Sequence, residues 1–203
     1  MSIVTAARLK RYGRAYFDRW YRERRIGSPA DLARVVALAV AMTEQVLARP
    51  VRSVLDVGAG EGRWQPILHR LRPQARYAGV DSSRWAIERW GRQRNLRLGS
   101  IDALDELGLD GPFDLVVASD ILHYLATPAL TLGMRQLVAL VGGVAFLPTF
   151  TVQDEIDGDR AHFQRRSAAT YRRIFSRAGL IPLGMYAWTL RTRKRDLAKL
   201  ELP

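Results

Sequence analysis

The sequence predicts an α/β fold built around a mostly parallel sheet. Short apolar runs alternate with amphipathic stretches at roughly 10- to 15-residue spacing, which is typical of βαβ units with helices on both faces of the sheet. A glycine-rich turn follows the first apolar run directly and opens a helix. The chain has 203 residues and is 48% apolar, so one domain with a full hydrophobic core is expected.

Each expected element rests on a local signal. Ser28 and Pro29 predict the start of a helix that runs to about Ala48, where Pro50 stops it. Ser82 or Ser83 is expected to cap another helix, and Ser167 a later one that Gly179 closes. Strands are expected at 52–57, 76–81, 96–101, 113–119, 142–150 and 181–190; helices are expected near Gly62, after Ser83, at 128–141 and at 167–180. Alternation of Ala198, Leu200 and Leu202 predicts a short final strand.

The first 50 residues are expected to form a helical extension or lid, with the ligand-binding α/β domain at 51–203. Tyr12, Tyr16 and Trp20 follow one another at four-residue spacing, which predicts a single stripe on an amphipathic helix. The segment is rich in arginine, but Asp18 and Glu23 argue against a mitochondrial presequence. We therefore expect this helix to pack on the domain.

Composition limits the classes of function. The net charge is +12, which raises the possibility of a nucleic-acid substrate, but the arginines are scattered and only three lysines occur. The absence of cysteine excludes disulfides, thiolate zinc sites and a cysteine nucleophile, and suggests a cytoplasmic protein. The longest uncharged apolar run, residues 35–42, is too short to span a membrane, and no metal site is expected.

The glycine-rich turn indicates the kind of ligand. Gly58, Gly60 and Gly62 are spaced G-x-G-x-G, with Arg63 where a dinucleotide fingerprint requires glycine. Asp56 precedes the first glycine by two residues, and a carboxylate there suits an ammonium group and repels a pyrophosphate. The pattern therefore favours a ligand with a charged amine.

The ends of the second and third expected strands indicate further groups of this ligand. Asp81 ends the second expected strand, where an acid accepts hydrogen bonds from a ribose diol. Asp102 follows the third strand and suits an exocyclic adenine amine, while Ile101 offers an apolar face. The ligand is expected to carry ribose and an amine.

Together these stretches resemble the class I S-adenosylmethionine-dependent methyltransferases. The resemblance covers about 52–190 and rests on "VLDVGAGEG", "YAGVDSS", "GSIDAL" and "FDLVVASDILHYL" in this order. It implies S-adenosylmethionine as methyl donor and a seven-stranded sheet in the order 3-2-1-4-5-7-6. The tail is short where the seventh strand is expected, which leaves that edge of the sheet open to question.

The resemblance also implies roles for particular residues. The residues expected to bind the donor are Asp56, Gly58, Gly60, Gly62, Asp81, Ser82, Ile101, Asp102 and Ser119. Those expected to bind the methyl acceptor are Tyr16, Trp20, Tyr21, Asp120, Tyr124 and His162. His123 is the candidate general base because histidine titrates near neutrality; the alternative is that it caps or packs a short helix. The acids at 154, 155, 157 and 159 lack calcium-loop spacing and predict a solvated loop.

Three functions fit these observations. The leading one is transfer of a methyl group to an oxygen or nitrogen of a small molecule by a monomer or homodimer. The first alternative is an RNA or protein methyltransferase, which the positive charge favours; "SDILHY", however, stands where amino-methylating nucleic-acid enzymes usually carry an Asn/Asp-Pro-Pro-aromatic sequence. The second alternative is a module that binds S-adenosylmethionine without catalysis.

Overall fold

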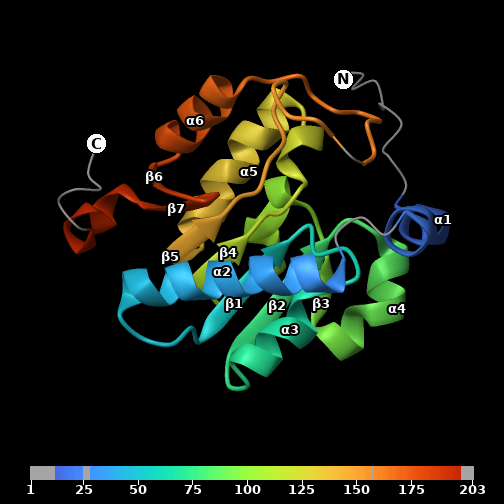
Figure 1. Ribbon diagram of the computed structural model, residues 1–203, viewed down its shortest axis with the longest axis horizontal. Coiled ribbons are helices and arrows are strands. Elements are labelled where there is room, and N and C mark those ends of the chain that lie inside the picture. The colour runs from blue at the N-terminus through green and yellow to red at the C-terminus, as the bar shows by residue number, and fades with distance from the viewer. Residues whose placement is uncertain (1–11, 25–27, 157, 198–203) are drawn as a thin grey trace.

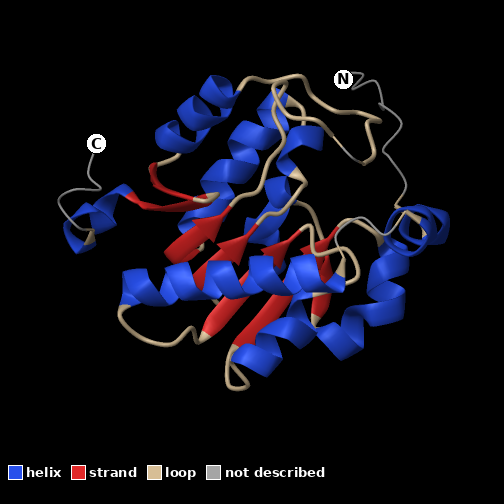
Figure 2. Cartoon of the chain, in the orientation of Figure 1, coloured by secondary structure: helices blue, strands red, loops and turns tan. Residues whose placement is uncertain are grey.

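A computed structural model describes residues 12–24, 28–156 and 158–197 of the chain. Seven strands form one sheet in the order β3-β2-β1-β4-β5-β7-β6, which confirms the expected order (Figure 1, Figure 2). β1, β2, β3, β4 and β5 run parallel to one another, whereas β7 is antiparallel to both of its neighbours. The strands are β1 Ser53–Val57, β2 Arg76–Asp81, β3 Leu96–Leu98, β4 Phe113–Val117, β5 Val141–Phe146, β6 Leu180–Gly184 and β7 Ala187–Leu190.

Helices surround the sheet, and three of them begin at the serine caps expected from the sequence. The side chains of Ser28, Ser83 and Ser167 each accept a hydrogen bond from a backbone N–H three residues later. Within the described ranges, no helix is long and apolar enough to cross a membrane. The α-helices are α1 Arg14–Phe17, α2 Pro29–Leu47, α3 Trp64–Leu71, α4 Arg84–Arg94, α5 Thr127–Ala139 and α6 Ala168–Arg177. The shorter helices are the π-helix η1 Asp18–Glu23 and the 3₁₀-helices η2 Ile101–Leu107, η3 Leu122–Tyr124 and η4 Arg191–Asp196.

Alternating strand residues divide the core between the two faces of the sheet. Leu55 and Val57 point to the face covered by η2, α5 and α6. Val54 points to the other face, where it packs with residues of α2 and α3. Both faces are therefore buried, as the long apolar runs of a parallel sheet require.

The predicted strand over 181–190 is wrong as a single element, because it folds into the β6–β7 hairpin. Met185 and Tyr186 form the turn with φ values of 50° and 65°, a left-handed conformation that usually requires glycine or asparagine. The hairpin supplies the seventh strand from within this stretch, which settles the doubt about that edge of the sheet. The final strand expected near 198–202 lies outside the described residues.

Three other strands are shorter than expected, and one of them is the strand predicted over 113–119, which ends at Val117. The strand predicted over 96–101 ends at Leu98, and Ile101 instead begins η2. The strand predicted over 142–150 ends at Phe146. After these two strands the chain continues with partly or fully buried residues, so burial and hydrophobicity alone do not mark where strand pairing ends.

The N-terminal segment, residues 12–24, also departs from the expected stripe. Its second half is a π-helix, in which the N–H of Arg24 bonds the carbonyl of Arg19 five residues earlier. The wider turn brings Phe17 and Tyr21 together, with ring centroids 5.5 Å apart. Phe17 is only 2% exposed, so it is the buried anchor of the segment although it lies outside the predicted stripe.

The topology fixes where a ligand can bind. Because β1 and β4 are neighbours while the chain winds outward from them in opposite directions, the switch point of the sheet lies between these strands. Ligands of open α/β sheets bind at the carboxyl ends of the strands near this point. Both the glycine-rich turn after β1 and the loop after β4 lie at this edge.

Candidate functional site

The glycine-rich turn, residues 58–62, leaves β1 in a left-handed conformation. Gly58, Gly60 and Gly62 have φ values of 75°, 55° and 68°. The N–H groups of Gly58 and Ala59 donate to the carbonyl of Val80 at 2.7 and 3.1 Å, which ties the turn to the end of β2. Residues with a Cβ rarely adopt this backbone, so the G-x-G-x-G spacing is a requirement of the turn itself.

The three glycines face different surroundings. A Cβ on Gly58 would stand 2.5 Å from the side chain of Ile121, and one on Gly62 would stand 2.9 Å from Leu96. These two glycines therefore allow close packing within the protein. Gly60 instead faces the N-terminal segment, with a ring atom of Phe17 3.3 Å and the hydroxyl of Tyr21 3.4 Å from its Cβ position.

Replacing Gly58 by alanine is expected to lower the free energy of unfolding by about 2–4 kcal/mol, because it adds a steric clash to backbone strain. Gly108 is the matched control, since its φ of 55° is also left-handed but nothing lies within 4 Å of its Cβ position. Gly108→Ala should cost only about 1 kcal/mol. Urea denaturation of both variants measures the difference, and equal losses would show that the contact with Ile121 is unimportant.

Asp81 closes the turn from the end of β2. Its two carboxylate oxygens accept hydrogen bonds from the N–H groups of Gly60 and Ser83, each at 2.7 Å. Burial raises the pKa of this carboxyl, while the two N–H donors oppose the rise. Each oxygen retains a lone pair, so the carboxylate can still accept from a diol.

Asp56 lies beside Asp81 on the neighbouring strand and is 3% exposed. Its Oδ2 accepts a hydrogen bond from the hydroxyl of Tyr77 at 2.7 Å. Burial raises the pKa of Asp56 to about 7, while the Tyr77 donor lowers it and the charge of Asp81 raises it. The sequence placed an acid here, but it did not indicate Tyr77 as its partner.

The loops after β2 and β3 hold the other residues expected to bind the donor. Ser82 is exposed, whereas Ser83 is buried and caps α4. Ile101 is 3% exposed and starts η2. Asp102 is half-buried and accepts a hydrogen bond from the hydroxyl of Ser100. Thus an apolar side chain and a carboxylate stand together after β3.

The loop after β4 carries Ser119, Asp120 and the η3 helix. Asp120 has a φ of 59°, and the hydroxyl of Ser119 donates to its carboxylate at 3.0 Å. Asp120 is exposed at the surface, yet the protein atoms that surround its carboxyl displace water and raise its pKa, while the Ser119 hydroxyl opposes the rise. A non-glycine residue in a left-handed conformation at this edge of the sheet is typical of functional sites.

His123 is fully buried, with 0% exposure, in an aromatic cluster. Its ring lies 4.2, 5.3 and 5.6 Å from those of Tyr124, Phe150 and Phe163. Its Nδ1 faces the N–H of Phe150 at 3.4 Å. These contacts favour the packing alternative for His123, and its role as a base stays a prediction.

The N-terminal segment covers the glycine-rich turn. Phe17 stacks on Trp85 of α4 at 5.0 Å, and Figure 1 shows α1 beside that helix. Arg22 pairs with Glu61 at 2.7 Å, and the Arg63 guanidinium lies 5.0 Å from the Tyr21 ring. No local pattern indicates that Phe17 and Trp85 meet, because their contact joins segments far apart in the chain.

Four tyrosines gather near the covered turn. Tyr12, Tyr16, Tyr21 and Tyr124 each have a pKa above the ordinary value, chiefly because of burial. The charges of Asp81, Asp120 and Asp159 reach members of this group and raise these pKa values further. At neutral pH the phenols therefore remain protonated and serve as hydrogen-bond donors or acceptors.

Other expected acceptor-binding residues lie less closely together. His162 is exposed and has a φ of 68°, and Trp20 is half-buried beneath the guanidinium of Arg19. Asp154 accepts hydrogen bonds from the N–H and hydroxyl of Thr151 within its own loop, and residue 157 lies outside the described ranges. In the part of the chain that the structure describes, no three His, Asp or Glu side chains gather as a metal site requires.

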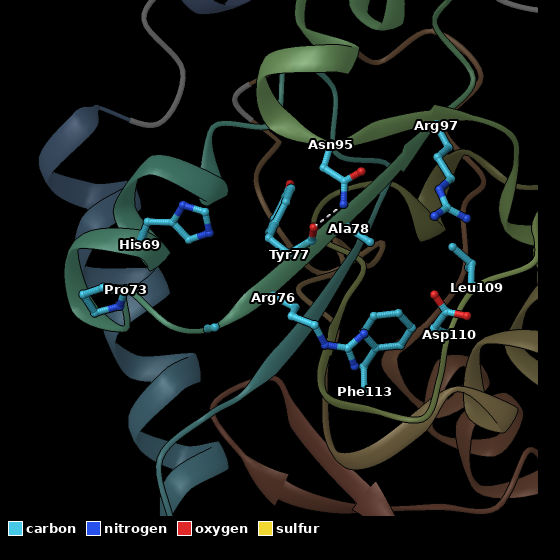
Figure 3. A pocket seen from close by; sticks show the side chains of 11 residues that line it. His69, Pro73, Arg76, Tyr77, Ala78, Asn95, Arg97, Leu109, Asp110 and Phe113 are labelled. Atoms are coloured by element: carbon cyan, nitrogen blue, oxygen red, sulfur yellow. Dashed lines mark hydrogen bonds between the residues drawn. The ribbon is translucent and has the colours of Figure 1, made fainter.

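A cavity of about 350 Å³ lies elsewhere, at the amino edge of the sheet (Figure 3). It is bounded by Arg76 at the start of β2, by Phe113 at the start of β4 and by Arg97. This edge is opposite the glycine-rich turn, so the cavity is separate from the candidate site.

The chain matches a family described as "Methyltransferase domain" over residues 21–183. No curated protein matches it in sequence. The family match spans most of the chain, including the glycine-rich turn and both Asp56 and Asp81.

Solved structures share the fold. A magnesium protoporphyrin IX methyltransferase from Synechocystis PCC 6803 with bound SAH is 20% identical, with a TM-score of 0.61, over 83% of this chain and 86% of that one. The sugar N-methyltransferase KedS8 from Streptoalloteichus is 18% identical, with a TM-score of 0.64, over 82% and 85%. An O-methyltransferase family protein from Burkholderia thailandensis is 18% identical, with a TM-score of 0.54, over 87% of this chain and 62% of that one. The chain thus spans less than two thirds of the Burkholderia protein.

Proposed function

Because the chain belongs to the class I S-adenosylmethionine-dependent methyltransferases, we propose that it methylates an oxygen or nitrogen atom of a small molecule. The donor is S-adenosylmethionine, and the enzyme is a transferase. The choice of a small acceptor, and the residues that bind it, are the proposed part.

The residues at the carboxyl edge fit this donor. Asp81 offers two carboxylate oxygens to the ribose, and Asp102 offers an acceptor to adenine. Ile101, expected from the sequence to give adenine an apolar face, is 3% exposed and packs in the core against Gly133 of α5. Asp56 offers a buried negative charge to the amino group of the methionine part. When bound, the donor supplies a methyl group that its sulfonium already activates, so the protein's work is to align the acceptor and exclude water.

The observation that carries the proposal is the cover over Gly60. Phe17 and Tyr21 close the turn from above, and Phe17 is 2% exposed. A covered site of this kind suits a small acceptor that is enclosed with the donor. Residues 12–24 are therefore proposed as a lid, whereas α2, expected from the sequence to belong to the same extension, packs in the core on the sheet.

Local charge supports the same choice over RNA. The whole chain carries +12, but Asp81, Asp120 and Asp159 lie close to the tyrosine group. Carboxylates at this edge repel a phosphate backbone, whose binding depends on cationic contacts. Relatives of the same fold include enzymes named for a sugar and for a porphyrin, both small molecules.

The proposal is tested by incubating the protein with S-adenosylmethionine and panels of small amines, small hydroxyl compounds and RNA. Formation of S-adenosylhomocysteine with a small compound is expected, with little dependence on salt. Turnover only with RNA, falling steeply as salt rises, would instead establish the nucleic-acid alternative.

His123, the base expected from the sequence, is fully buried, so we propose Asp120, whose exposed carboxyl follows β4, as a second candidate for the proton acceptor. Substitution separates the two. We expect Asp120→Asn to lower kcat about 100-fold, because a removed general base typically costs 10²–10⁴-fold. We expect His123→Gln to lower the free energy of unfolding by about 1–3 kcal/mol while the folded fraction keeps its turnover. Donor affinity, measured by calorimetry, controls for loss of the site. The reverse pattern would make His123 the base.

A further inference from the structure

The side chain of Tyr77 extends from β2 to the donor site on the neighbouring strand β1. It lies on β2 opposite Val54 of β1, whereas Asp56 lies opposite Gly79, two residues further along β2. Tyr77 and Gly79 share one face of the sheet, since side chains alternate along a strand. The missing side chain at Gly79 leaves space for the phenol, whose oxygen lies 3.3 Å from the Cβ position there. The hydroxyl therefore meets Asp56 Oδ2 diagonally, at 2.7 Å.

The position of Tyr77 is fixed on both sides. Its main chain pairs with β1, and its carbonyl accepts a hydrogen bond from Asn95 Nδ2 at 2.6 Å (Figure 3). Asn95 lies immediately before β3, which begins at Leu96. Tyr77 is 5% exposed and belongs to the core shared with α2 and α3. A rigid, buried phenol thus meets Asp56 in one geometry.

This contact leaves the two oxygens of Asp56 unequal. Oδ2 accepts from Tyr77, but no residue in the described ranges donates a hydrogen bond to Oδ1. Among the described residues, Oδ1 is not one of the fully buried polar atoms that lack a partner, so this oxygen keeps some access to solvent at the edge of the sheet although Asp56 as a whole is 3% exposed. Asp56 lies two residues before Gly58, at the carboxyl end of β1. The free acceptor capacity therefore points to a donor group supplied by a ligand at this edge.

We propose that Tyr77 is a positioning residue of the donor site, holding Oδ2 of Asp56 so that Oδ1 receives the α-ammonium group of S-adenosylmethionine. This inference rests on the proposed donor site. A single oxygen held in place accepts an ammonium hydrogen with less loss of side-chain freedom than an unrestrained carboxylate. Phenylalanine would fill the same volume but would leave Asp56 unrestrained.

Charge also couples the pair. After burial, the charge of Asp81 is what raises the pKa of Asp56. Burial also raises the pKa of Tyr77, while the charge of Arg94 in α4 lowers it and that of Asp81 raises it. The hydroxyl of Tyr77 stabilises the ionised form of Asp56, so its loss moves the pKa of Asp56 upward. A purely structural role for Tyr77 would not move that pKa.

The test uses calorimetry to compare how the Tyr77→Phe variant binds two thioether ligands, neither of which carries a sulfonium charge. S-adenosylhomocysteine carries the ammonium group, whereas 5′-methylthioadenosine has the same adenosine and thioether but no amino acid. The Kd for S-adenosylhomocysteine is expected to rise about tenfold, and that for 5′-methylthioadenosine less than twofold. The pH at which S-adenosylhomocysteine affinity falls on acidification should move upward. Tyr171→Phe is the matched control, since Tyr171 is also buried and bonds Arg166 on the other face of the sheet.

A milder variant gives the same test if Tyr77→Phe does not fold. Asn95→Gly keeps the left-handed backbone of this exposed residue but removes the bond to the Tyr77 carbonyl. It should lower the affinity for S-adenosylhomocysteine two- to threefold and leave the affinity for 5′-methylthioadenosine unchanged. Equal weakening of both ligands, or no change in either, would overturn the role of Tyr77. Failure of the unaltered protein to bind S-adenosylmethionine would instead overturn the donor site.

Discussion

Asp81→Asn is expected to raise the Kd for S-adenosylmethionine at least 100-fold. The carboxylate both holds the N–H groups of Gly60 and Ser83 and is proposed to accept from the ribose. Charge-assisted hydrogen bonds contribute about 1.5–3 kcal/mol each, so loss of two accounts for this factor. The asparagine amide also turns an N–H donor toward a backbone N–H. Calorimetry with S-adenosylmethionine measures the change.

Glu88→Gln provides the control, since it removes an acid from the exposed side of α4 without touching the turn. Its affinity should stay within twofold of the unaltered protein. Retained affinity in Asp81→Asn would mean that the donor does not rely on this carboxylate, and the proposed arrangement of the site would have to be abandoned.

Asp56→Asn is expected to stabilise the protein and to lower its affinity for S-adenosylmethionine. Because the pKa of Asp56 is raised to about 7, the folded chain opposes its ionisation. The penalty is absent below the ordinary pKa of about 3.8, grows as pH rises and is complete above about 7, where it amounts to at most about 4 kcal/mol. Asparagine keeps an oxygen for the Tyr77 hydroxyl without this penalty.

Urea denaturation at pH 5 and pH 8 checks the prediction. The variant should gain about 1–3 kcal/mol at pH 8 and clearly less at pH 5. Asp105→Asn, which removes an exposed acid of η2, should show no such difference between the two pH values. At pH 8 the Kd of Asp56→Asn for S-adenosylmethionine should rise about tenfold or more. A variant less stable than the unaltered protein at pH 8 would contradict the assigned state of Asp56.

Much of the fold follows from local signals in the sequence. The alternation of apolar runs with amphipathic stretches predicts the order of strands and helices, and serines predict three helix starts. The glycine spacing predicts a left-handed turn after β1, and each of the three glycines has a positive φ. These signals suffice because they depend on residues a few positions apart.

Where the sequence misleads, a longer-range contact decides. Gly184, with a φ of 91°, is a local signal for a turn within this stretch, but neither Met185 nor Tyr186 favours the left-handed backbone that it adopts. The pairing of β7 with both β5 and β6 holds them there. Similarly, Phe17 is buried because η1 widens the helix and Trp85 of a distant helix receives the ring.

The residues of the candidate site can likewise be separated into those indicated by local sequence and those that depend on long-range contacts. The sequence by itself determined which acids stand at the strand ends, because each follows an apolar run directly. Only the tertiary structure decided their partners: the bond between Tyr77 and Asp56 depends on the register of β1 against β2 and on an empty position at Gly79. Register is set by the packing of whole strands, so a side chain that acts diagonally across two of them leaves no mark in the local pattern.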